Sequence, residues 1–158
     1  MLNKFLILTA ISSVMIGCAS VPTSNNESTQ LIKQVNTPQT GHSGLYIFRS
    51  NSVIGGALKK DIWVDGNCIG ESARGIFFYE EVKGDQEHQI ATESEFSPNI
   101  LLLKTEQGKN YFVQQYIKPG AFVGGANLKV VDETTGKTEI QKLQLAQKGK
   151  CSKEFKKS

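Results

Sequence analysis

The sequence of 158 residues predicts an all-β protein, a single antiparallel β-sandwich that follows a signal peptide and a disordered tether. Three observations predict this class. Fifteen glycines and many β-branched side chains favour short strands and tight turns. Alternating apolar and polar residues recur in about nine short segments, roughly 8 to 12 residues apart, as in a sandwich or a partly open barrel. No segment between them is long enough for a crossover helix, so we expect antiparallel pairing.

The expected strands follow one another within a domain of residues 44–146. The sharpest local signal is Asp65-Gly66, which accepts the positive φ angles of a tight hairpin. The run after Pro98 is continuously apolar at its centre, as in a strand covered on both faces. The sequence TTGK, residues 134–137, is expected to be the turn of a last hairpin. We expect strands at 44–50, 61–64, 67–72, 75–82, 87–95, 99–106, 108–118, 126–133 and 138–146.

Residues 1–17 have the pattern of a lipoprotein signal peptide. Lys4 supplies positive charge, and Phe5 to Ile16 form an apolar core too short to cross a bilayer, which needs about 20 apolar residues. The run Met15-Ile16-Gly17-Cys18 resembles the lipobox of bacterial lipoproteins, with methionine where leucine is usual. This resemblance implies cleavage before Cys18 and acylation of its thiol and of the new amino group.

Acylation at Cys18 would attach the protein to a membrane. One acyl chain binds a bilayer reversibly, whereas two or more keep the protein stably anchored. By analogy with the sorting of Gram-negative lipoproteins, Ala19 in place of aspartate favours the periplasmic face of the outer membrane. The alternative is an ordinary secretory peptide cut near Ala19, which leaves no anchor.

Two polar segments flank the expected domain. Residues 18–43, the acylated N-terminus and a flexible tether, are rich in Ser, Thr, Asn, Gln and Pro and lack the apolar side chains of a core. Such a tether would hold the domain roughly 25 to 30 Å from the anchor. Residues 147–158 form a basic C-terminal tail.

The remaining two cysteines, Cys68 and Cys151, form an even pair in an exported chain. Exported proteins fold in an oxidising compartment, so we expect a disulfide between them, which would stabilise the fold by about 4 kcal/mol. The alternative is two separate thiols, one in a strand and one in a mobile tail. Their spacing does not match a redox motif or a zinc site.

Five short runs within residues 43–146 occur in a distinctive order. They are Leu45-Tyr46-Ile47-Phe48-Arg49, Ile62-Trp63-Val64-Asp65-Gly66, Gly75-Ile76-Phe77-Phe78, Gly108-Lys109-Asn110-Tyr111-Phe112-Val113 and Gly124-Gly125. In this order the chain resembles the DUF2846 family of bacterial lipoproteins. The resemblance implies a small exported β-rich domain, similar to PEGA-like and transthyretin-like sandwiches, with no established activity.

Two loops with paired glycines are the candidate binding elements. Each places two apolar residues before two glycines, and paired loops at one end of a sandwich can present backbone amides to an anion or a glycan. The glycines can equally serve unusual φ angles or close packing between the loops, and the apolar pairs can contact a partner or a membrane. The candidate residues are Val53, Ile54, Gly55 and Gly56 in one loop and Phe122, Val123, Gly124 and Gly125 in the other.

The sequence offers no catalytic or metal-binding constellation, so we expect a protein that is not an enzyme and uses no cofactor. His42 and His88 have no second histidine at ligand spacing, which argues against a metal site. Glu93 and Glu95 are interpreted as a solvated strand face. The net charge of +3 combines 18 basic and 15 acidic residues and, without a nucleic-acid-binding motif, does not favour nucleic acid as a partner.

The sequence therefore favours a lipid-anchored outer-membrane protein on the periplasmic face, acting as a non-enzymatic interaction or structural module. Its expected partners are the membrane, through the N-terminal anchor, and an envelope protein or glycan. The alternative function is a binding module for a cell-envelope glycan or lipid that uses the glycine loops and neighbouring aromatic side chains.

Overall fold

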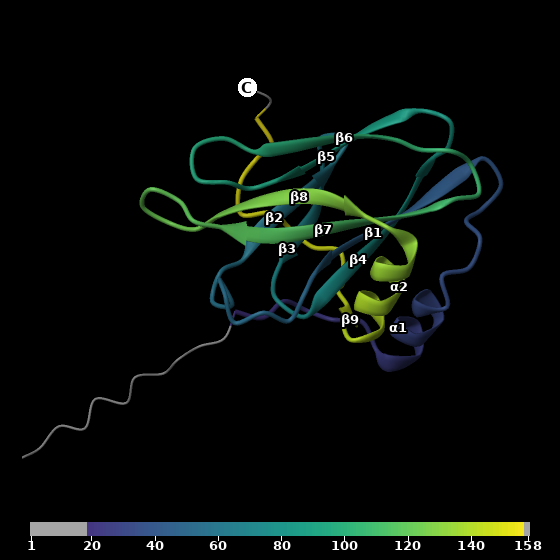
Figure 1. Ribbon diagram of the computed structural model, residues 1–158, viewed down its shortest axis with the longest axis horizontal. Helices are drawn as coiled ribbons and strands as arrows, with labels where there is room; N and C mark the ends of the chain where they lie inside the picture. Colours follow the sequence, from purple (N-terminus) through teal and green to yellow (C-terminus); the bar gives the residue numbers. More distant parts are fainter. Residues whose placement is uncertain (1–18, 157–158) are drawn as a thin grey trace, which may run out of the picture.

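The computed structural model describes residues 19–156, which form two β-sheets packed face to face (Figure 1). The predicted all-β sandwich is confirmed. One sheet has the strand order β8-β7-β1-β4-β9 and the other β3-β2-β5-β6. The elements are α1 (Asn26–Lys33), β1 (His42–Arg49), β2 (Lys60–Val64), β3 (Asn67–Ser72), β4 (Ile76–Lys83), β5 (Glu87–Thr92), β6 (Asn99–Lys104), β7 (Asn110–Lys118), β8 (Gly125–Val131), α2 (Glu133–Gln141) and β9 (Gln144–Leu145).

The five-stranded sheet is not purely antiparallel, which corrects the expected pairing, whereas the four-stranded sheet is antiparallel throughout. β1 pairs with β7 in parallel, and β4 pairs with β9 in parallel. The expectation failed because it required a helix to make the crossover. Here the connection from β1 to β7 runs through the whole second sheet and β4, which supplies the length that a parallel connection needs.

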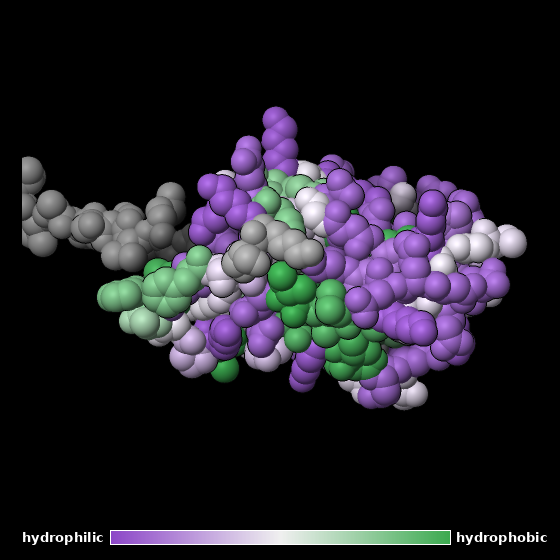
Figure 2. Space-filling model, turned by 90° about the horizontal axis from the view of Figure 1, so that it is seen from above, coloured by the Kyte–Doolittle hydropathy of each residue, from purple (hydrophilic) through white to green (hydrophobic). Residues whose placement is uncertain are grey.

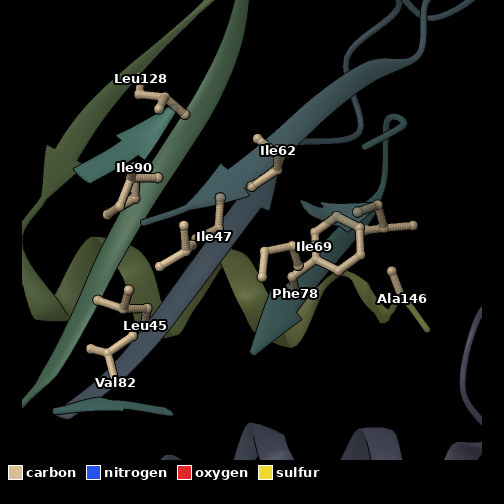
Figure 3. Packing of buried hydrophobic residues seen from close by; sticks show 12 residues of the cluster. Leu45, Ile47, Ile62, Ile69, Phe78, Val82, Ile90, Leu128 and Ala146 are labelled. Atoms are coloured by element: carbon tan, nitrogen blue, oxygen red, sulfur yellow. The ribbon is translucent and has the colours of Figure 1, made fainter. Parts of the chain in front are cut away.

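Alternation along β1 builds two separate apolar clusters. Leu45 and Ile47 point toward the second sheet and pack in a cluster that includes Ile62, Phe78 and Ile90 (Figure 3). The intervening residues face the other way, where the two helices cover the sheet. This second cluster contains Tyr46, Phe48, Phe77, Phe112, Ile140 and Leu143.

The predicted C-terminal hairpin is wrong, because the chain forms helix α2 between β8 and β9. The Asp132 side chain accepts a hydrogen bond from the backbone N–H of Thr135 and so caps the helix. Gly136 lies inside the helix, not in a hairpin turn, and Ile140 is fully buried. Burial of one face against β7 therefore outweighs the strand-like local sequence.

The predicted flexible tether is also wrong over the described residues 19–43. Val21 packs against the core, and Thr23 pairs with Ala146 in an isolated β-bridge. Helix α1 follows, capped by the Asn25 side chain, and its Lys33 ammonium donates a 2.9 Å hydrogen bond to the carbonyl of Gln141. Apolar contacts of a few residues, together with helix caps and hydrogen bonds of polar residues, hold this segment on the domain, which composition alone does not reveal.

The sequence predicts that this strand is covered on both faces, but only one face of β6 packs against the core. β6 is an edge strand of its sheet, and only alternate residues, Leu101 and Leu103, pack against the core. Ile100 and Leu102 are exposed by 41% and 59% and form an apolar strip on the outer face of β6. Figure 2, which views the molecule from the top of Figure 1, where β6 lies, shows a green apolar patch on this side.

The C-terminal tail lies on the second sheet. Cys68 and Cys151 form a disulfide, with Cα atoms 5.9 Å apart and 83 positions apart in sequence. The buried carboxylate of Asp61 accepts hydrogen bonds from the backbone N–H groups of Ser152 and Lys153, at 3.0 and 2.9 Å. The described part of the tail, residues 147–156, is therefore docked on the domain.

Candidate functional site: the loop end

Three loops lie together at one end of the sandwich. β1, β5 and β7 end there, and β2, β6 and β8 begin there, so the connecting segments 50–59, 93–98 and 119–124 share that end. We call these three segments the loop end. Both glycine-pair loops predicted as binding elements belong to it, apart from Gly125, which is the first residue of β8.

The loop end carries large apolar side chains at exposed positions. They come from all three loops, including segment 93–98, which the sequence reading did not select. Singly exposed apolar residues are ordinary on a protein surface, but a group of them on neighbouring loops marks a contact site. The exposed fractions are 83% for Val53, 73% for Ile54, 81% for Phe96, 87% for Phe122 and 55% for Val123.

The glycine pairs let the two loops approach one another through Ile117. A Cβ atom placed on Gly55 would lie 2.6 Å from Cγ1 of Ile117, and Gly55 also has a φ of 66°. A Cβ atom on Gly124 would lie 2.8 Å from a methyl group of Leu58 in the other loop. Both glycines therefore serve close packing of the loops, one of the two roles considered from the sequence.

Arg49 holds the loop that carries Val53 and Ile54. Its buried guanidinium donates hydrogen bonds to the carbonyls of Leu58, at 2.7 Å, and of Gly55. A third, longer bond reaches the carbonyl of Ser72. Burial lowers the pKa of Arg49 from its ordinary value, because desolvation disfavours the charged form.

Glu95 holds the loop that carries Phe122. Its carboxylate accepts hydrogen bonds from three successive backbone N–H groups, those of Ala121, Phe122 and Val123, at 2.7, 2.5 and 3.0 Å. The bond from Val123, followed by those from Phe122 and Ala121, lowers the pKa of Glu95. The interpretation of Glu95 as part of a solvated strand face is therefore wrong, because it lies beyond the end of β5 and binds backbone.

A groove of about 390 Å³ runs beside Phe96, between the loop end and the C-terminal tail. Trp63 and Glu93 contribute to its wall, as does Lys153 of the tail, whose ammonium lies 2.7 Å from the Glu93 carboxylate. Glu93 also pairs with the buried Lys60 at 3.6 Å. The groove thus combines aromatic surface with paired charges.

The other candidate groups have structural roles or lie elsewhere. His88 is buried, with Nδ1 2.6 Å from the Asp65 carboxylate and Nε2 2.7 Å from the carbonyl of Lys83, so it fixes the β2–β3 turn. His42 lies at the start of β1, opposite Lys83 of β4, in the other sheet from His88. Within residues 19–156, no group of three or more His, Cys, Asp or Glu side chains is placed to hold a metal ion.

The predicted lipidation site, Cys18, lies outside the described residues. Among the residues that are described, no helix has both the length and the apolar character needed to cross a bilayer. Glu95 and Phe96 of the loop end, and Arg49 at the end of β1 beside it, are the residues that the sequence did not predict. Only their placement beside the loops reveals them, because the local sequence contains no signal for it.

Comparisons with known proteins identify the family. The model of a protein family of unknown function, DUF2846, matches residues 39–126. A protein of Haemophilus influenzae (strain ATCC 51907 / DSM 11121 / KW20 / Rd), described as an uncharacterized protein, is 52% identical over 136 residues, which cover 86% of this chain and 80% of that protein. No solved structure matches the chain significantly. The chain belongs to the DUF2846 family.

Proposed function

We propose that this protein is an exported lipoprotein, acylated on Cys18 and held on the periplasmic face of the outer membrane, where it binds an envelope protein and catalyses no reaction. The observation that carries the proposal is the early start of the folded body. Val21 already packs against the core, only three positions after the lipobox cysteine. Acyl chains on Cys18 would therefore hold a rigid domain directly at the membrane.

The proposed partner surface is the apolar strip of β6, Ile100 and Leu102. β6 pairs with β5 on one side and is an edge strand of its sheet. A partner protein can therefore add backbone hydrogen bonds at the strand edge to apolar contacts with the strip.

The test has two parts, one for the anchor and one for the partner. Growth with labelled palmitate should label the wild-type protein and not Cys18→Ser, and the wild type should fractionate with the outer membrane. A photocrosslinking residue in place of Leu102 should give a discrete protein adduct in cells. The same residue in place of Lys142, which is exposed on the far side at the end of α2, is the matched control. An unlabelled wild type would contradict the anchor, and identical adduct patterns would contradict the partner surface.

A second candidate function is glycan binding in the groove beside Phe96. The specific observation is the combination of an exposed aromatic ring, at Phe96, with the paired charges of Glu93 and Lys153. Aromatic faces with a few convergent polar groups are typical of small-ligand sites. Calorimetric titration with cell-wall oligosaccharides would show binding that Phe96→Ala abolishes.

A further inference from the structure

We propose that the loop end docks on the lipid surface beside the anchor. Val53, Ile54, Phe122 and Val123 enter the interfacial region of an anionic bilayer. This inference rests on the acylation of Cys18 proposed above, and it adds the orientation of the domain on its membrane.

The first argument is the short connection to the proposed anchor. Cys18 is joined to Ala19 by one peptide bond, and the chain is already fixed to the domain at Val21 and Pro22, whose carbonyl accepts a 3.0 Å hydrogen bond from the N–H of Gln147. Since a fully extended residue spans at most about 3.6 Å, the three steps from Cys18 to Val21 can span at most about 11 Å. The side of the domain near Val21 must then lie close to the bilayer.

The second argument is that the loop end is on this same side. The described chain begins at the lower left of Figure 1, and the β7–β8 loop projects to the left above it. Figure 2, turned about the horizontal axis, keeps the left of Figure 1 at its left and shows green apolar atoms at the left edge of the described surface. Val21 and Pro22 line a groove together with Glu71. Glu71 in turn pairs at 3.1 Å with Lys59, the last residue of segment 50–59.

The third argument is the chemistry of the loop end. Segments 50–59 and 119–124 contain no acidic residue, and Lys59 and Lys118 stand at their borders. Both carboxylates of segment 93–98 have partners within the protein, since Glu93 binds two lysines and Glu95 binds the backbone of the Phe122 loop. Exposed apolar tips bordered by lysine suit the interface of an anionic membrane.

The fourth argument is that the apolar tips are held in place before they meet any surface. Arg49 fixes the backbone at Gly55, and Glu95 fixes the backbone at Phe122. A site whose shape is already set loses little conformational entropy on binding. The tips are therefore ready to enter the lipid as soon as the anchor brings them to it.

The test measures the depth of single added tryptophans in the acylated, full-length mature protein. The protein is placed in vesicles of phosphatidylethanolamine and phosphatidylglycerol with brominated acyl chains, which quench tryptophan on contact. Ile54→Trp and Phe122→Trp report on the loop end. Leu31→Trp, at an exposed position on α1, is the matched control, and the signal of the buried native Trp63 is subtracted with the wild-type protein.

Brominated lipid should quench the added tryptophan of Ile54→Trp and Phe122→Trp at least about twofold more than that of Leu31→Trp, because interfacial side chains enter the acyl-chain boundary. Equal quenching at the three positions, in protein shown by mass spectrometry to be acylated, would overturn the docking and leave the anchor intact. Absence of acylation would overturn both proposals. A photocrosslinker at Phe122 that yields a protein adduct in cells, with no lipid adduct, would also overturn the docking.

Discussion

At the scale of single residues, the shape of the Phe122 loop depends on the Glu95 carboxylate. Glu95→Gln replaces one acceptor oxygen by an NH₂ group, which faces backbone N–H donors at 2.5 to 3.0 Å. We expect amide hydrogen exchange at residues 121–123 to become several-fold faster in the variant, with global unfolding almost unchanged. Exchange measured by NMR at neutral pH checks this, and unchanged exchange would contradict the assigned role.

The same carboxylate should make the loop sensitive to acid. Backbone hydrogen bonds, that from Val123 first, lower the pKa of Glu95 in the folded protein below its ordinary value of 4.5. The stabilisation is therefore fully present above pH 4.5 and is lost as the pH falls through the lower folded pKa. Protection of the amides at 121–123 should fall in this acidic range in the wild type and stay flat in Glu95→Gln.

Arg49 is the corresponding residue for the other glycine loop, and it is buried. Arg49→Met removes the donors for the carbonyls of Gly55, Leu58 and Ser72 and leaves buried acceptors without partners. Since one such loss costs about 1 to 3 kcal/mol, we expect the free energy of unfolding to fall by at least about 2 kcal/mol. Urea denaturation measures it. Arg49→Lys keeps the charge with fewer directed donors, so its free energy of unfolding should lie between those of the wild type and Arg49→Met.

At the scale of elements, helix α2 exists because one of its faces fits against β7. A Cβ atom on Gly136 would collide with the ring of Phe112, which is fully buried. Gly136→Ala should therefore lower the free energy of unfolding by about 1 to 3 kcal/mol, although alanine favours a helix by about 1 kcal/mol over glycine. Thr134→Ala, at an exposed position of the same helix, is the control and should be neutral or slightly stabilising. Thermal unfolding of both variants measures the change in the free energy of unfolding, and a Gly136→Ala variant as stable as Thr134→Ala would contradict the predicted collision with Phe112.

The same helix shows how far the sequence determines these elements. The Asp65-Gly66 hairpin could be predicted because its turn needs positive φ at both residues, and these are 51° and 79° in the structure. Helix α2 could not, since its β-like sequence is overridden by contacts with Phe112, a residue distant in sequence. The ordered segment before residue 43 was missed for the opposite reason, because its few apolar side chains, such as Val21 and Ile32, follow no regular pattern and its other contacts are hydrogen bonds.

The docked tail is the element that the disulfide controls. Replacing Cys68 and Cys151 by alanine should lower the free energy of unfolding by about 4 kcal/mol, the value for a closed loop of this length. In this double variant the tail residue Phe155, whose ring centre lies 5.6 Å from that of Trp63, should also move away from Trp63. This separation should change the tryptophan emission. Phe155→Ala is the matched control, because it changes the emission but keeps the covalent link. A double variant with unchanged emission would show that the tail docks without the bridge.

At the scale of the whole molecule, layers of different kinds cover the two sheets. The helices cover the outer face of the first sheet, and the tail lies over Trp63 on the second. The end loops are held by Arg49 and Glu95 but leave their apolar tips exposed. The proposed acylation of Cys18, close to this end, would give the sandwich a fixed orientation on its membrane.

The orientation should therefore depend on the length of the connection between Cys18 and the domain. A Gly/Ser linker of about ten residues inserted after Ala19 would add a mean reach of roughly 17 Å and relax the proposed constraint. We expect palmitate labelling and outer-membrane fractionation to remain as in the parent protein. Quenching of the tryptophan in Phe122→Trp by brominated lipid should fall by about half, because the longer linker lets the domain adopt many orientations besides the docked one. The same linker added after Lys156 is the control and should change neither measurement. Undiminished quenching with the N-terminal linker would mean that the loops bind lipid without help from a short anchor.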